Sequence, residues 1–168
     1  MPAADLPEVR RDDGVVIRVV AGSVDGVEGP VHGIVAEPGY LDVTVPTRGR
    51  FVQPVPRGHA VFAYLFEGEG RFGVTVDGGY RTGGTGAPAN APRLLLFADG
   101  DEVRVETDER PARFLLVSGK PLGEPVARYG PFVMTTRSEI EQALRDLRAD
   151  EFVWRDDPAW LRTRRATG

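Results

Sequence analysis

The stretch Ala60–Phe66, which reads AVFAYLF, is the most continuous apolar run of the chain and decides its fold. It is too short for a helix that buries itself, and it is rich in aromatic residues, so it predicts a central β-strand. Because side chains alternate along a strand, Phe62, Tyr64 and Phe66 share one face and the residues between them share the other. The chain is therefore expected to be built around a sheet.

The residues that follow this stretch predict a hairpin. Glu67–Gly70 has the composition of a turn, and Arg71–Val76 is expected to be the returning strand. Residues 77–92 are rich in glycine and proline and predict a mobile surface loop.

Further strands are predicted on both sides of this hairpin, at Val15–Val20, Tyr40–Val45, Leu94–Phe97, Glu102–Glu106 and Ala112–Val117. Phe51–Pro56 contains two prolines that cannot donate to a strand ladder, so we place it at an edge. About eight or nine strands at hairpin spacing indicate an all-β fold, a small barrel or jelly roll.

One α-helix is predicted after the strands. Thr136 and Glu139 have the spacing of a capping box, and Ile140, Leu144 and Leu147 recur at helical spacing. Such a narrow apolar stripe must pack on the barrel or on a partner. The predicted organisation is an N-terminal extension at 1–14, a barrel at 15–134, the helix at 135–153 and a tail at 154–168.

Composition excludes several classes of function. The 168 residues contain 21 Lys and Arg against 25 Asp and Glu, a net charge of −4, which disfavours charge-driven binding of nucleic acid. The absence of cysteine excludes disulfides, thiolate zinc sites and thiol nucleophiles. No apolar run is long enough to span a membrane as a helix, so we expect a cytoplasmic protein with no membrane partner.

Candidate catalytic groups are few. His32 and His59 are the only histidines, and no spacing motif directs them to one metal ion. The serines Ser23, Ser118 and Ser138 lack the surroundings of a nucleophile elbow. From the residues alone we expect no metal and no catalytic residue.

Four segments, at 58–70, 95–101, 114–122 and 124–134, make the chain similar to the C-terminal half of pirins. The resemblance implies a cupin-type β-barrel, one of two in tandem, with the single metal held by the N-terminal barrel. Where that barrel's signature has two histidines before Arg-Gly, this chain has Pro54 and Pro56. The resemblance therefore implies a metal-free half without a cofactor.

Two roles follow from the resemblance. The first is a structural, protein-interaction or regulatory module that forms a homodimer or binds a separate N-terminal cupin chain. The candidate contact residues for this role are Arg128, Tyr129, Phe132, Ile140, Leu144 and Leu147.

The second role is a pirin-like enzyme such as a quercetin 2,3-dioxygenase. It would use iron or another divalent transition metal, either in an unusual site of His32, His59 and Glu67 or in a separate N-terminal cupin chain. A third reading, a metal-free small-molecule binder, places the ligand in the barrel interior near Phe62, Tyr64 and Phe66.

Overall fold

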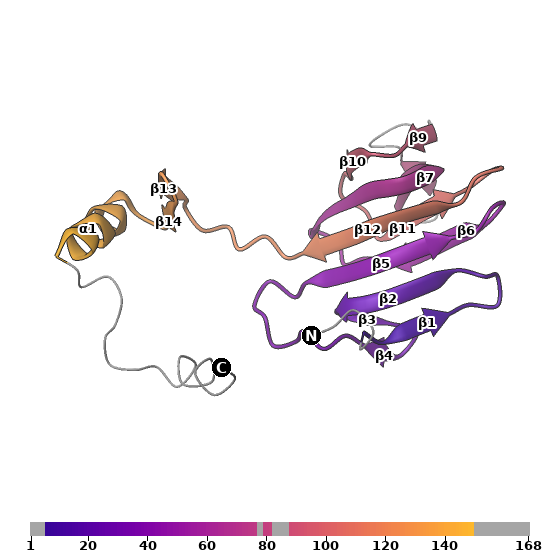
Figure 1. Ribbon diagram of the computed structural model, residues 1–168, viewed down its shortest axis with the longest axis horizontal. Helices are drawn as coiled ribbons and strands as arrows, with labels where there is room; N and C mark the ends of the chain where they lie inside the picture. Colours follow the sequence, from indigo (N-terminus) through magenta and orange to yellow (C-terminus); the bar gives the residue numbers. More distant parts are fainter. Residues whose placement is uncertain (1–5, 77–78, 82–87, 150–168) are drawn as a thin grey trace, which may run out of the picture. The chain divides into compact units, whose positions relative to one another are not determined.

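Residues 6–76, 79–81 and 88–149 are described by a computed structural model, and most of them form short antiparallel strands (Figure 1). Chain contacts divide the protein into two units, Met1–Leu122 and Gly123–Gly168. The strands of the first unit are β1 (Glu8–Arg10), β2 (Val16–Ala21), β3 (Ser23–Val24), β4 (Val27–Glu28), β5 (Gly39–Val45), β6 (Arg50–Pro54), β7 (Ala60–Val76), β8 (Gly79–Arg81), β9 (Pro88–Asn90), β10 (Arg93–Leu96), β11 (Glu102–Glu106) and β12 (Ala112–Gly119). The second unit holds β13 (Ala127–Tyr129), β14 (Phe132–Met134) and α1 (Arg137–Arg148).

The first unit is a ten-stranded antiparallel sheet that curls on itself. Its main path runs β1-β2-β5-β12-β7-β11-β6, and β8, β9 and β10 also pair with β7. Phe114 of β12 packs edge-on against Phe51 of β6 at 5.6 Å and against Phe72 of β7 at 5.1 Å. Strands β12 and β6 are not neighbours in the sheet, so the contact between their rings shows that the sheet folds over a shared core. The predicted all-β fold is confirmed, as is the edge position of Phe51–Pro56.

Strand β7 differs from the predicted hairpin. It continues through Glu67–Gly70 to Val76, and the predicted turn is wrong. Gly68 has φ +77°, and the register with β12 shifts between Arg113 and Phe114, which marks a bulge. The bulge bends the strand, so that its first half pairs with β12 and β10 and its second half with β11, β8 and β9.

The predicted loop at 77–92 is wrong where the structure describes it. Strands β8 and β9 lie within that range and pair with the second half of β7. Residues 77–78 and 82–87 of the predicted loop lie outside the described residues.

The second unit is a β-hairpin followed by the predicted helix. Thr136 caps α1, its hydroxyl accepts from the backbone N–H of Glu139 at 3.3 Å, and the Glu139 carboxylate accepts from the Thr136 N–H at 2.7 Å. Helix α1 contacts both strands of the hairpin. The predicted barrel range of 15–134 therefore spans the boundary at Leu122, and the predicted tail at 154–168 lies outside the described residues. Within the described ranges, no helix has the length and apolar character needed to cross a membrane.

Candidate functional site

A cavity of about 550 Å³ opens at the end of the curled sheet where β12 finishes and β5 begins. Its wall is formed mainly by the end of β2, the β3–β4 turn, the start of β5, the end of β12 and the segment from β6 to β7. The lining residues are Ala21, Gly22, Ser23, Val24, Asp25, Glu37, Pro38, Gly39, Leu41, Gln53, Pro54, Val55, Pro56, His59, Leu116 and Ser118.

His59 is held in the cavity wall by a tight turn. The His59 N–H donates to the Pro56 carbonyl at 3.3 Å, and Gly58 takes the left-handed conformation that this turn needs, with φ +77°. The turn is fixed from outside by Asp99, whose carboxylate accepts from the Gly58 N–H at 2.7 Å. The imidazole Nδ1 of His59 is buried and has no hydrogen-bond partner.

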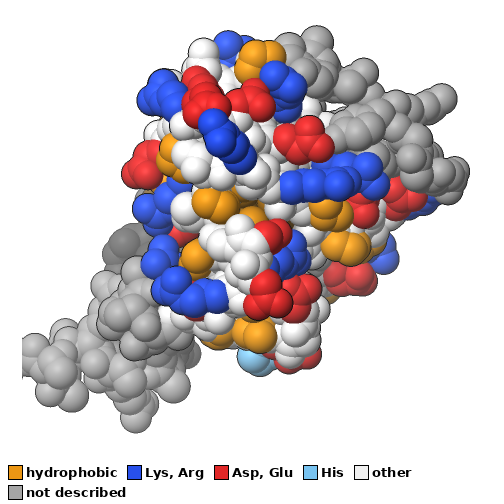
Figure 2. All heavy atoms as spheres, turned by 90° about the vertical axis from the view of Figure 1, so that its right-hand side faces the viewer, with side chains coloured by type: hydrophobic (Ala, Val, Ile, Leu, Met, Phe, Trp, Pro, Cys, Tyr) orange, Lys and Arg blue, Asp and Glu red, His pale blue; other side chains and the backbone are white. Residues whose placement is uncertain are grey.

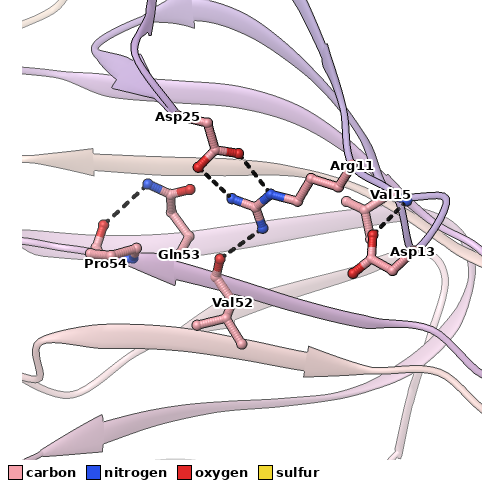
Figure 3. A network of polar contacts seen from close by, with 7 residues as sticks. All are labelled: Arg11, Asp13, Val15, Asp25, Val52, Gln53 and Pro54. Carbon is pink, nitrogen blue, oxygen red and sulfur yellow. Dashed lines mark hydrogen bonds and ion pairs between the residues drawn. The ribbon is translucent and has the colours of Figure 1, made fainter.

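Gln53 is the second polar group in the wall, and the sequence reasoning did not single it out. Its side chain shares the inward face of β6 with the buried Phe51, and the buried Val55 follows at the same alternation. That alternation is the signal by which it could have been found. Its Nε2 donates to the Pro54 carbonyl at 3.3 Å, whereas its Oε1 is buried without a partner (Figure 3).

Arg11 links three separate segments beside the cavity (Figure 3). Its guanidinium donates to the Asp25 carboxylate at 2.9 Å and to the Val52 carbonyl of β6 at 3.0 Å, and it lies 5.6 Å from the centre of the Phe51 ring. The bridge thus connects the β1–β2 and β3–β4 segments to β6, the last strand of the main path. It also neutralises Asp25, one of two carboxylates in the wall.

The described residues do not fit a transition metal. They contain no group of three His, Cys, Asp or Glu side chains placed to hold an ion. His59 lines the cavity, but His32 is exposed on the β4–β5 connection and Glu67 is exposed on β7, and neither lines it. The structure therefore does not assemble the alternative ligand set. Pro54 and Pro56, at the positions where the resemblance to pirins places histidines, line the cavity and offer no side-chain donor atom.

The three aromatic residues predicted to line the barrel interior, Phe62, Tyr64 and Phe66, lie on the other face of β7, so that prediction is wrong. Tyr64 is 41% exposed, whereas Ala63 and Leu65 are fully buried. Strand pairing places Tyr64 between Leu94 and Leu115, and Phe62 between Leu96 and Val117. We call these two rows on β10, β7 and β12 the outer apolar face: Leu94, Tyr64, Leu115, Leu96, Phe62 and Val117.

Charged residues border the outer apolar face. Arg113 of β12 makes a bidentate ion pair with Asp42 of β5 at 3.1 and 2.8 Å, and its guanidinium lies 5.2 Å from the centre of the Phe66 ring. The hydrogen bond to Asp42 raises the pKa of Arg113, against the opposing effect of burial. Figure 2 shows basic, acidic and apolar side chains interspersed on the face that it presents, so the described side chains there form no extended field of one sign.

The predicted contact residues all lie in the second unit. Tyr129 is 63% exposed, Leu147 is 52% exposed and Arg128 is exposed as well. Ile140 is buried, as is Ala143, which the predicted stripe omitted. The first part of the apolar stripe of α1 therefore packs against its own hairpin, whereas Leu147 at the end of the stripe is exposed to solvent.

Comparisons with known proteins agree with this geometry. Residues 40–153 match the family model of the pirin C-terminal cupin domain. The chain is 38% identical over 148 residues to a putative quercetin 2,3-dioxygenase of Pseudomonas aeruginosa, covering 86% of this chain and 48% of that protein. It is 30% identical over 155 residues to human pirin, with coverages of 88% and 48%.

A solved structure shows the same fold. A quercetin 2,3-dioxygenase of Acinetobacter baumannii superimposes with a TM-score of 0.70 at 26% identity, over 90% of this chain and 49% of that chain. The chain thus spans about half the length of the curated relatives and of this neighbour.

Proposed function

Because the chain belongs to the pirin family through its C-terminal cupin domain, we propose that it is a metal-independent interaction module that docks a second cupin barrel. The observation that carries the proposal is the outer apolar face. It lies on the opposite side of the sheet from the core and is open to solvent along β10, where Leu94 is 57% exposed and Leu96 is 70% exposed, whereas Phe62, Leu115 and Val117 are half-buried.

The form of this face is typical of a protein interface. Soluble monomers seldom expose contiguous apolar patches, and when they do the patch is often a contact site. Two adjacent rows of apolar side chains cross three paired strands here, and the Asp42–Arg113 ion pair lies next to them. An apolar centre with a charged border is the usual anatomy of such interfaces.

The proposed occupant is an N-terminal-type cupin barrel, in the same or in a separate polypeptide. The chain matches 48% of the Pseudomonas relative, and the remainder of that relative is long enough for a second barrel. A second copy of this chain is the competing occupant.

The test mixes the full chain with the half of the Pseudomonas relative that the chain does not match, and follows assembly by analytical ultracentrifugation. A one-to-one complex is expected. The double variant Leu94→Ser, Leu96→Ser should weaken it by at least about tenfold, because burying each leucine contributes on the order of 1.5–3 kcal/mol. Val35→Ser is the matched control, because Val35 is 79% exposed on the β4–β5 connection and is not one of the residues of the outer apolar face.

Two results would refute the docking proposal. The first is that the chain associates neither with the half of the Pseudomonas relative nor with itself, and the second is that the double variant binds as tightly as the wild-type chain. A homodimer of the chain alone that the same double variant disrupts would identify a second copy as the occupant instead of the N-terminal barrel.

A second candidate is a pirin-like enzyme such as a quercetin 2,3-dioxygenase, whose metal is held by the N-terminal barrel. The names of the Pseudomonas relative and of the Acinetobacter structure favour it. Quercetin consumption by the iron-loaded complex, and none by either half alone, is the expected result. Equal consumption by the chain alone would place the activity here and contradict the metal-independent role.

A further inference from the structure

We propose that the cavity beside His59 binds an uncharged organic molecule that carries a hydroxyl group on an apolar body. The proposal does not depend on docking, because the cavity lies inside the curled sheet and the outer apolar face lies outside it. Its volume of about 550 Å³ falls in the usual range of small-molecule sites, roughly 300–1,000 Å³.

Two unsatisfied polar atoms point to a ligand. His59 Nδ1 and Gln53 Oε1 are buried without a hydrogen-bond partner, and both residues line this cavity. Leaving such an atom buried and unpaired is energetically costly, so native structures seldom keep one without a reason. Here two of them belong to the wall of one cavity, which is where a bound molecule would satisfy them.

The hydrogen-bonding capacity of these atoms selects a hydroxyl group. Gln53 Oε1 can only accept, and the Nε2 of the same amide already donates to the Pro54 carbonyl at 3.3 Å. The ligand must therefore donate. A neutral imidazole presents Nδ1 as a donor or an acceptor according to its tautomer, and a hydroxyl group matches both. A carboxylate only accepts, so it cannot satisfy Gln53 Oε1.

The charge of the wall disfavours an ionic ligand. Among the described residues that line the cavity there is no Lys or Arg, so an anion would lack a counter-charge. A cation would gain little electrostatic stabilisation, because Asp25 is already paired with Arg11 and the exposed Glu37 is screened by solvent. The rest of the wall includes Val24, Val55 and Leu116, against which an apolar body packs.

The test uses three naphthalene derivatives of similar size with the full chain. These are 2-naphthol, which donates a hydrogen bond, 2-methoxynaphthalene, which only accepts, and 2-naphthoate, which is an anion. Affinities are measured by isothermal titration calorimetry, and imidazole nitrogens are followed by NMR at about pH 8, above the ordinary histidine pKa. The chain has only two histidines, so His32, which does not line the cavity, is an internal control.

The proposal predicts that 2-naphthol binds at least about fivefold more tightly than either other compound, the value of one hydrogen bond of about 1 kcal/mol. It also predicts that the Nδ1 resonance of His59 moves while those of His32 stay in place. Gln53→Met, which keeps the length of the side chain and removes the acceptor, should abolish the advantage of 2-naphthol over 2-methoxynaphthalene.

Three results would overturn the proposal: no binding of 2-naphthol, equal or tighter binding of 2-naphthoate, or equal shifts of both histidines. The wild-type NMR titration decides the matter even if the Gln53 variant fails to fold. The Leu94→Ser, Leu96→Ser variant should keep full affinity for 2-naphthol, so that failure of docking and failure of ligand binding are told apart.

Discussion

Replacing Gly68 by alanine should destabilise the first unit far more than an ordinary glycine substitution. Gly68 has φ +77°, a conformation that costs an L-residue about 1–2 kcal/mol. The new Cβ would also overlap the Pro111 carbonyl oxygen, so β7 and the start of β12 must separate. That movement endangers two hydrogen bonds, from the Glu69 N–H to the Pro111 carbonyl at 3.2 Å and from the Ala91 N–H to the Gly68 carbonyl at 3.0 Å. With about 1 kcal/mol for each bond, the expected loss is about 3–4 kcal/mol.

Gly26→Ala is the matched control for this substitution. Gly26 has φ +81°, but a Cβ there would meet no atom within 4 Å, so only the backbone cost of about 1–2 kcal/mol applies. Urea unfolding, followed by the β-sheet signal in circular dichroism, gives both free energies of unfolding. Equal losses for the two variants would refute the reasoning, because they would show that β7 and β12 do not approach closely at the bulge.

Three further substitutions test other parts of the structure. Arg11→Ala removes a charged donor to the Val52 carbonyl and should lower the free energy of unfolding by about 1–3 kcal/mol in urea titration, with no recovery in Arg11→Lys. Phe114→Ala removes a fully buried ring between two others and should cost about 3–5 kcal/mol, seen as a lower melting temperature. Hydrogen bonds to the Glu139 carboxylate, first that from the Thr135 hydroxyl, lower the pKa of Glu139. The stabilisation of the helix cap is therefore fully present above the ordinary glutamate pKa and is lost as the pH falls through the lowered pKa of Glu139. Helical circular dichroism should fall over that acid range, and Glu139→Gln should flatten the fall; an unchanged titration in the variant would contradict the assignment.

Local patterns predicted the elements that local physics determines. The helix start follows from the capping box of Thr136 and Glu139, and the structure contains both of its hydrogen bonds. Strand β5 follows from alternation, with Leu41, Val43 and Val45 buried and the residues between them less so. In each case the signal lies within a few residues of the element it predicts.

Non-local pairing determined what the sequence patterns missed. Glu67–Gly70 has the composition of a turn, but a single glycine in the left-handed region makes a bulge as readily as a hairpin. Only the partners of the two halves of β7, which come from β10, β11 and β12, decide between the two. Alternation likewise separated the two faces of Ala60–Phe66 without showing which is internal. The core rings come from Phe51, Phe72 and Phe114, and the face that meets them carries the smaller Ala63 rather than Tyr64.

The two proposed binding surfaces follow from the same alternation on β12. Leu116 lines the cavity, whereas Leu115 and Val117 point the other way and belong to the outer apolar face. The docking experiment substitutes Leu94 and Leu96 of β10 and the ligand experiment substitutes Gln53 of β6, so each changes one surface and leaves the side chains of the other in place. Pro54 and Pro56 contribute no metal-binding side chain to the cavity wall, and they do not fill the cavity. A barrel that only had to support a neighbouring domain would gain stability by filling this space, since interiors otherwise pack to high density. The retained cavity, with two unsatisfied polar atoms in its wall, is thus the feature that docking alone does not explain.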